Sequence, residues 1–284
     1  MATSTAGSWF RRSVWLAVAA LVAGSGVALY VDGRLPAAVP ADAPVYRLVD
    51  LSRALEAVNA SGEVNLGELK ARHESLERFV ASLAATAPAT KPDQFPTPED
   101  KVAYWLNAYH ALVLVELLDV RGTAAGQLSS VGRSWPIGGE RLTKRAILRR
   151  FLEATGDGRV PLTLFTGARG HGVLDGAPFD AQTLDAQLDD AMRRFMRRKE
   201  NVVIDGKTVR VSALLEQHEA ELLAALPPDR HGLMQIVWAY LPESCDGLRP
   251  GCPTRGELDR ACGARLDQCA VEWVAVDETL AVVP

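Results

Sequence analysis

The sequence predicts an α+β fold: a mainly helical single domain with a central buried helix, a small β-sheet or hairpin, and an N-terminal transmembrane helix. Three observations lead to this prediction. Apolar residues recur at helical spacing through most of the chain, runs that alternate like strands are short and few, and one long apolar stretch lies near the N-terminus. A content of 48% hydrophobic and 23% charged residues is typical of a globular protein.

The N-terminal apolar stretch predicts a membrane anchor over residues 14–31. No charged residue lies between Ser13 and Asp32, and about 17–25 apolar residues are enough to cross the hydrocarbon core. Arg11 and Arg12 precede the stretch, so the positive-inside rule places the N-terminus in the cytoplasm and the rest of the chain outside. A cleaved signal peptide is the alternative, and it would make the protein secreted.

The composition divides the chain into three parts. Residues 1–34 hold a cytoplasmic stub and the transmembrane anchor or signal, residues 35–44 form a linker rich in proline and alanine, and residues 45–284 form one domain. In either version of the N-terminus, we expect this domain to be extracytoplasmic, in the periplasm or on the cell surface.

The central helix is predicted from Thr97 to Leu118. Thr97 suits the N-cap, and a proline follows it at the first helical position. From Val102 to Leu118 the helix is apolar on every face apart from Asn107, His110 and Glu116, and a helix that is apolar all round is buried. Its charged first turn and its Asn–His pair argue against a second membrane span. We therefore expect Asn107 to be buried and hydrogen-bonded, because an unpaired buried amide costs about 1–3 kcal/mol.

The other elements follow from periodicity and turn residues. The apolar run PLTLF is predicted to be a strand, Asp205-Gly206 marks a β-hairpin, and VEWVAV alternates like a closing strand. The remaining helices are expected over residues 65–85, 142–155, 179–199, 212–228 and 229–241.

All four cysteines lie in the C-terminal segment 245–269 and predict two disulfides. They are Cys245, Cys252, Cys262 and Cys269, and an even number clustered in an exported chain is typical of disulfide bonding. A zinc site is the alternative, but six residues separate the two cysteines of each outer pair, where zinc sites usually have two to four. Three pairings are possible, and the sequence does not choose among them.

A glycine-rich turn follows the PLTLF run and has the character of a functional loop. It reads FTGARGHGVLDG and carries His171 among closely spaced glycines. The glycines are spaced G-x-x-G-x-G and no helix begins directly behind them, so the turn does not fit a dinucleotide or phosphate site. We expect His171 to lie beside the central helix, within reach of a pocket that includes Asn107 or His110.

Four segments occur in an order that resembles one family. They are YWLNAYHALVLVELL, WPIGGERLTKRAILR, LTLFTGARGHGVLDGAPFDAQTLDAQLDDAMRRFM and VEWVAVDETL. Together they resemble the domain-of-unknown-function-547 (DUF547) family over residues 45–284, and this resemblance implies no agreed reaction. It does imply departures: Thr166 and His171 stand where the family's turn typically carries two cysteines, and Lys144 and Arg145 stand where it carries a Glu-His pair.

These departures limit the chemistry that the site can perform. A thiolate nucleophile needs a cysteine and usually a neighbouring base, so the resemblance implies a degenerate member, a pseudoenzyme. The candidate catalytic residues are His171, Thr166, His110 and Asn107, in an arrangement where an imidazole would activate a hydroxyl. A metal site formed by His110, His171 and Asp175 is a minor alternative, since these residues lack ligand spacing. No cofactor is expected.

A non-catalytic binding or scaffold role in a membrane-tethered, extracytoplasmic domain is therefore the expected function. Its partners would be the membrane, through residues 14–31, and an unknown protein or small-molecule ligand. A hydrolase or transferase with a histidine-centred site in the 166–172 turn is the alternative. A net charge of −4 and an isoelectric point near 5.8 argue against nucleic acid as a partner.

Overall fold

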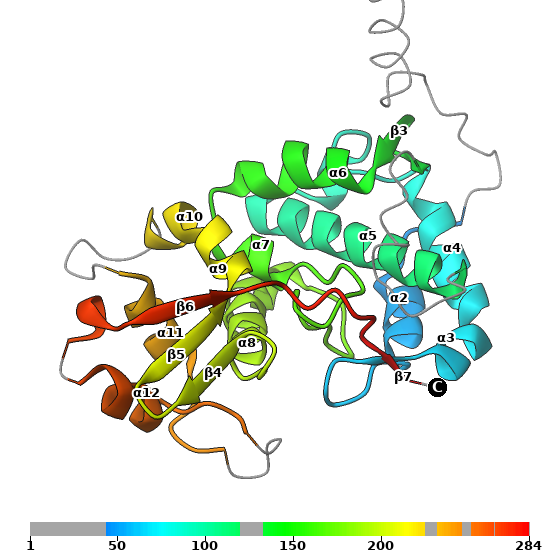
Figure 1. Ribbon diagram of the computed structural model, residues 1–284. Helices are drawn as coiled ribbons and strands as arrows, with labels where there is room; N and C mark the ends of the chain where they lie inside the picture. Colours follow the sequence, from blue (N-terminus) through cyan, green and yellow to red (C-terminus); the bar gives the residue numbers. More distant parts are fainter. Residues whose placement is uncertain (1–43, 120–132, 225–231, 246–250, 264, 284) are drawn as a thin grey trace, which may run out of the picture.

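The computed structural model describes residues 44–119, 133–224, 232–245, 251–263 and 265–283 (Figure 1). This part of the chain has mixed helix and strand content, and its strands form three small sheets. Buried apolar side chains gather in two clusters, one around a long central helix and one around a three-stranded sheet.

The first cluster surrounds helix α5, which is green-cyan in Figure 1 and is flanked by short helices and a hairpin. Its elements are α2 (Leu48–Leu55), β1 (Val64–Asn65), α3 (Leu66–Ala71), α4 (His73–Leu83), η1 (Pro92–Gln94), α5 (Pro98–Asp119), β2 (Ser134–Ile137), β3 (Glu140–Thr143), α6 (Lys144–Ile147), η3 (Leu148–Leu152) and η4 (Glu153–Thr155). Strands β2 and β3 pair antiparallel, and η3 is a π-helix that continues α6.

The second cluster is built on the sheet β4-β5-β6 and the helices around it. Its elements are α7 (Arg159–Thr163), α8 (Leu184–Met196), β4 (Val202–Asp205), β5 (Thr208–Ser212), α9 (Ala213–Gln217), α10 (Glu219–Ala224), α11 (Leu233–Tyr240), α12 (Arg255–Cys262), η6 (Leu266–Gln268) and β6 (Val271–Val274). The short helix η5 (Ala181–Thr183), just before α8, packs on α5 of the first cluster. Helix α8 joins the clusters, because Leu184 and Leu188 near its start pack in the first, and Met192 and Phe195 near its end pack in the second.

The C-terminal segment crosses from the second cluster to the first. After β6 the chain, red in Figure 1, runs back across the molecule and ends in β7 (Val282–Val283), which pairs parallel with β1. On the way, Leu280 forms a bridge with Ala168 in the glycine turn. The two clusters are therefore tied together by this segment as well as by α8.

Helix α5 is buried as the sequence predicted. Thr97 caps it, since its hydroxyl accepts the Asp100 N–H at 3.1 Å while the Asp100 carboxylate accepts the Thr97 N–H at 3.0 Å. Trp105 is 5% exposed and stacks on Phe151 of η3, with ring centroids 3.8 Å apart. The apolar faces of α5 thus meet neighbours on several sides, which explains why its hydrophobic residues show no single stripe.

The predicted fold class is wrong in its transmembrane helix. Within the described ranges, no helix is long and apolar enough to cross a membrane. Helix α5 has the length, with 22 residues, but it has an acidic first turn and an ion-paired Glu116. The stretch 14–31, on which the anchor prediction rested, lies outside the described residues.

The run PLTLF is also not a strand. Its first three residues complete α7, and Leu164 then turns to an extended conformation. The helix starts because Asp157 accepts two N–H groups: its carboxylate takes that of Arg159 at 2.9 Å and its carbonyl that of Val160 at 3.0 Å. Proline tolerates the first turn of a helix, so Pro161 does not oppose it.

The hairpin and the disulfides agree with the sequence. Strands β4 and β5 pair antiparallel around Gly206, which has a φ of 61°. The disulfides join Cys245 to Cys252 and Cys262 to Cys269. The structure thereby selects one of the three pairings that the sequence left open.

Candidate functional site

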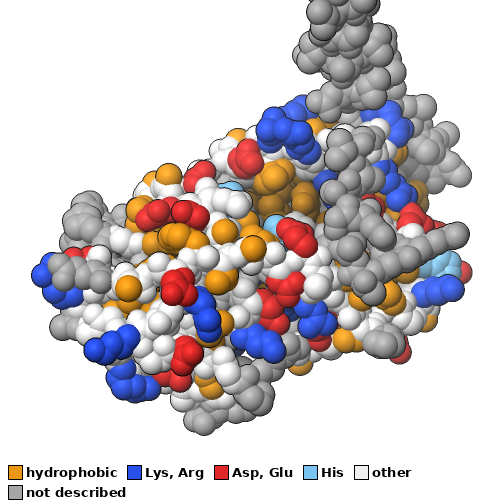
Figure 2. All heavy atoms as spheres, in the orientation of Figure 1, with side chains coloured by type: hydrophobic (Ala, Val, Ile, Leu, Met, Phe, Trp, Pro, Cys, Tyr) orange, Lys and Arg blue, Asp and Glu red, His pale blue; other side chains and the backbone are white. Residues whose placement is uncertain are grey.

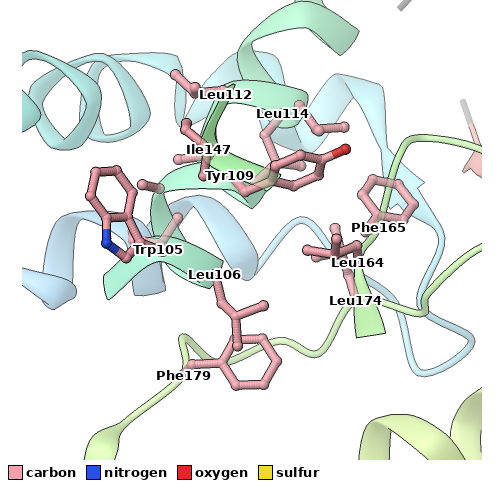
Figure 3. Close-up of a cluster of buried hydrophobic side chains, with 14 of the residues drawn as sticks. Trp105, Leu106, Tyr109, Leu112, Leu114, Ile147, Leu164, Phe165, Leu174 and Phe179 are labelled. Atoms are coloured by element: carbon pink, nitrogen blue, oxygen red, sulfur yellow. The ribbon is translucent and has the colours of Figure 1, made fainter. Parts of the chain in front are cut away.

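Asn107 of α5 holds the backbone that follows the glycine turn. Its side-chain amide donates to the carbonyl of Phe179 at 2.8 Å, and its side-chain carbonyl accepts the Phe179 N–H at 2.8 Å. Asn107 is only 2% exposed, and Figure 3 shows Phe179 and Leu106 of the same helix in one cluster of buried hydrophobic side chains. The predicted burial and hydrogen bonding of Asn107 are confirmed, and both of its polar groups serve the fold.

His110, one turn further along α5, holds the backbone that precedes the glycine turn. Its Nε2 accepts the N–H of Phe165 at 3.1 Å, and the ring also forms a hydrogen bond with the backbone of Thr163. Because Nε2 accepts, the proton of the neutral ring is on Nδ1. Burial lowers the pKa of His110 to about 3, although the hydrogen bond to Thr163 acts in the opposite direction. His110 is therefore a neutral anchoring residue and a poor general base.

The glycine turn packs on the C-terminal segment rather than directly on α5. The N–H groups of Arg169 and Gly170 donate to the carbonyls of Thr279 and Asp277, both at 2.9 Å. A Cβ on Gly170 would lie 2.5 Å from the backbone nitrogen of Asp277. The turn thus needs glycine because two backbone segments approach closely there.

His171 lies at the surface of this turn, with 19% of its side chain exposed. Its Nε2 is 3.4 Å from a carboxylate oxygen of Glu278. That carboxylate is its hydrogen-bond partner within the described part of the chain, whereas Asn107 and His110 bond to the backbone of Phe179 and Phe165. The next residue, Gly172, donates to the carbonyl of Leu164 at 3.1 Å, so the Thr163–Phe165 backbone separates His171 from His110.

The other predicted site residues are also placed apart. Thr166 is half-buried at the start of the turn. Asp175 is exposed and pairs with Arg194 at 3.0 Å. Among the described residues no three His, Cys, Asp or Glu side chains are grouped to hold a metal ion, so His110, His171 and Asp175 do not form the metal site that was the minor alternative.

The position of the family's Glu-His pair holds an ion pair instead. The Lys144 ammonium lies 2.6 Å from the carboxylate of Glu116, which is 5% exposed. Nearby on α5, burial raises the pKa of Tyr109 to about 12, and the negative charge of Glu116 adds to that shift. The phenol is therefore neutral at physiological pH and is not an activated nucleophile.

His218 is a site residue that the sequence analysis missed. It follows α9, and its ring interacts electrostatically with His171 from the glycine turn and with Glu153 and Glu221. Burial lowers the pKa of His218, while the two glutamates oppose this change. Its Nδ1 is buried and has no hydrogen-bond partner among the residues that the structure describes. Figure 2 shows histidine side chains on this face beside acidic groups and a recessed apolar area.

No local signal links His218 to the turn, because the two histidines come from distant parts of the sequence. The π-helix η3 precedes Glu153 of this group, and π-helical turns often occur near functional sites. A pattern search along the chain finds neither the proximity nor the π-helix, since both depend on tertiary packing.

These features define a class of protein: a domain whose buried helix anchors both ends of a surface turn, with polar residues at the turn and no thiol within it. Residues 93–196, from η1 to the end of α8, match the family described as Protein of unknown function, DUF547. This match supports the membership of the chain in the DUF547 family, in agreement with the resemblance of its sequence. No curated protein and no solved structure matches the chain.

The pKa of His110 predicts an acid-sensitive fold. A histidine has a pKa of about 6.5 in the unfolded chain, and the folded value is about 3. The unfolded state therefore binds the proton first, so the stabilisation is complete above pH 6.5 and is lost as the pH falls toward 3. Because of the depressed pKa of His110, we expect the free energy of unfolding to be about 2 kcal/mol lower at pH 5 than at pH 7.

Urea unfolding at the two pH values measures this loss of stability. In His110→Gln, the difference in unfolding free energy between pH 7 and pH 5 should be smaller than in the wild-type protein. His73→Gln is the control, because His73 is exposed on α4. Should His110→Gln fail to fold, the wild-type imidazole can be followed by NMR. A His110 resonance that titrates near pH 6.5 in the folded protein contradicts the prediction.

Proposed function

We propose that this DUF547 domain binds a ligand or protein partner at the glycine turn and does not catalyse a reaction. The observation that carries the proposal is the role of the polar residues on α5. The side-chain polar atoms of Asn107 and His110 form hydrogen bonds with the backbone of Phe179, Phe165 and Thr163. They build the turn and are not free to act on a substrate.

The charge pattern around His171 also supports a binding role. The imidazole contacts the exposed carboxylate of Glu278 and interacts electrostatically with His218, whose buried Nδ1 has no hydrogen-bond partner within the described ranges. Such a surface offers both donors and acceptors to a polar ligand. A nucleophilic mechanism would instead need a thiol or hydroxyl in contact with the imidazole.

Replacing His171 by alanine tests the proposal. We expect the free energy of unfolding to change by less than about 1 kcal/mol, because the side chain is partly exposed and its one ion pair is long. Metabolites retained by the immobilised protein from an extract of its native compartment, measured by mass spectrometry, should be lost in His171→Ala. They should be retained in His73→Ala, which removes an exposed histidine elsewhere.

A hydrolase or transferase is the second candidate, and the contact between His171 and Glu278 favours it. A carboxylate can orient an imidazole that activates a hydroxyl, and Thr166 begins the same turn. Chromogenic esters, amides, phosphoesters and glycosides separate the two candidates. Turnover that disappears in both His171→Ala and Thr166→Ala, with substrate binding intact, would replace the binding proposal by the catalytic one.

We also propose that the domain works outside the cytoplasm. The two disulfides support this, because disulfides persist in oxidising compartments and are rare in the cytosol. Alkylation of the protein taken directly from its native cells, followed by mass spectrometry, tests the proposal. Four alkylated cysteines would contradict it.

A further inference from the structure

A pocket of about 430 Å³ lies in the second half of the domain, between η4, α7, α10 and α11. It is lined by Thr155, Gly156, Asp157, Arg159, Leu222, Ile236 and Tyr240. We propose that this pocket binds an organic cation, an ammonium or guanidinium group carried on a short apolar chain. None of its lining residues belongs to the 166–172 turn, so the inference does not rest on the function proposed above.

Arg159 in the pocket is not available to bind an anion. Its Nε and Nη2 donate to the two carboxylate oxygens of Asp157, and Nη2 also donates to Asp185 at 2.8 Å. Its Nη1 donates to the carboxylate of Asp189 at 2.7 Å and to the carbonyl of Asp185 at 3.4 Å. A guanidinium has five N–H groups, and protein oxygens accept all five here.

The carboxylates around Arg159 leave negative charge in excess. Asp157, Asp185 and Asp189 together face one guanidinium, so two negative charges remain uncompensated within this group. Arg193 also contacts Asp189, but it is paired more closely with Asp190. Including Arg193 and Asp190 in the group adds one positive and one negative charge, so the excess of two negative charges is unchanged. The field at the pocket therefore favours a positively charged ligand.

Asp157 places this charge on the pocket wall. Burial raises the pKa of its carboxyl, but the hydrogen bonds from Arg159 outweigh burial, and the pKa lies below its ordinary value. The group is thus ionised at neutral pH. With 28% of its side chain exposed, it can accept a further donor from a ligand.

Tyr240 supplies an aromatic surface beside the carboxylates. Its hydroxyl donates to Asp189 at 3.0 Å, and burial together with the charge of Asp189 raises the pKa of the phenol to about 12. The ring is therefore neutral and held in place by that hydrogen bond. The face of a neutral tyrosine ring attracts ammonium and guanidinium groups.

Another part of the pocket wall is apolar and favours a ligand whose uncharged part is a hydrocarbon chain. Leu222 of α10 and Ile236 of α11 are 4% and 2% exposed and belong to the second hydrophobic cluster. A short alkyl chain can lie against them while its charged end reaches Asp157 and Tyr240. The volume is within the range of about 300–1,000 Å³ that is common for small-molecule sites.

Four small probes with short alkyl chains test the inference on the wild-type protein. Butylguanidinium and butylammonium carry the predicted charge, whereas butyrate and butanol have alkyl chains of similar length without a positive charge. In calorimetry or NMR titration, we expect the two cations to saturate and to bind at least about tenfold more tightly than butyrate or butanol, and added salt to weaken them. Butyrate or butanol binding as tightly as the cations would overturn the proposal.

Asp157→Asn locates the site, because asparagine keeps the shape and a hydrogen-bond acceptor but removes the charge. We expect cation affinity to fall about tenfold, and Asp205→Asn, the same change at an exposed position of the β4–β5 hairpin outside the pocket lining, to have little effect. If Asp157→Asn lowers the melting temperature so far that binding cannot be measured, Tyr240→Leu replaces it as the test. Cation affinity that is unchanged in a folded Asp157→Asn or Tyr240→Leu protein refutes the assignment.

Discussion

Gly172→Ala is expected to lower the free energy of unfolding by about 3 kcal/mol or more, because the new methyl group would overlap backbone atoms that cannot move independently. A Cβ at this position would lie 2.3 Å from the carbonyl oxygen of Thr163 and 2.4 Å from its carbonyl carbon. The same stretch of backbone is held from its other side by His110. Neither the turn nor the Thr163–Phe165 segment can shift without breaking these hydrogen bonds.

Gly176→Ala is the matched control for this prediction. It makes the same chemical change later in the same loop, where the nearest atom to a new Cβ is 3.9 Å away. Chemical denaturation followed by circular dichroism compares the two variants with wild type. Equal stability of Gly172→Ala and Gly176→Ala would mean that the turn does not pack on Thr163.

Asn107→Leu is expected to lower the free energy of unfolding by roughly 2–5 kcal/mol. The substitution leaves two buried backbone groups without their hydrogen-bond partner, and each such group costs about 1–3 kcal/mol when unpaired. Leucine has similar size and high helix propensity, so the loss would come from the N–H and carbonyl of Phe179 and from the Tyr46 side chain, which also hydrogen-bonds to Asn107. Among the residues that the structure describes, Asn107 is the hydrogen-bond partner of the Phe179 N–H. The effect is therefore one of folding and not of activity alone.

Gln182→Leu provides the comparison, since this side chain is exposed in η5 and the same kind of substitution there should be nearly neutral. Urea denaturation of both variants, with the slope of the unfolding free energy against urea checked against wild type, measures the difference. A stable Asn107→Leu protein would show that solvent or another group satisfies Phe179.

Both predictions concern residues whose importance was partly visible in the sequence. An asparagine in a helix that is apolar on every face must be buried, and a buried amide must find partners, so the environment of Asn107 followed from composition and period. The identity of its partner did not, because Phe179 is distant along the chain and the Asn–backbone contact is a product of packing. The same holds for His110, which could be predicted as buried but not as the acceptor for the Phe165 N–H.

The sequence predicted correctly those features that depend on interactions among a few neighbouring residues. The cap at Thr97, the hairpin at Gly206 and the oxidised state of four clustered cysteines need only short-range geometry or redox chemistry. The strand predicted at PLTLF failed because a short apolar run fits a buried helix as well as a strand, and Asp157 starts a helix there.

By itself, therefore, the sequence determined the buried central helix, the resemblance to the DUF547 family, the hairpin and the number of disulfides. Only the tertiary structure decided which cysteines pair, that the glycine turn packs on the Asp277–Leu280 stretch, that His171 meets Glu278, and that Asp157 and Tyr240 share a pocket. These contacts, apart from the short disulfide loops, join residues far apart in the chain. Periodicity and turn chemistry report the state of a segment, whereas such pairings depend on how whole segments pack against each other.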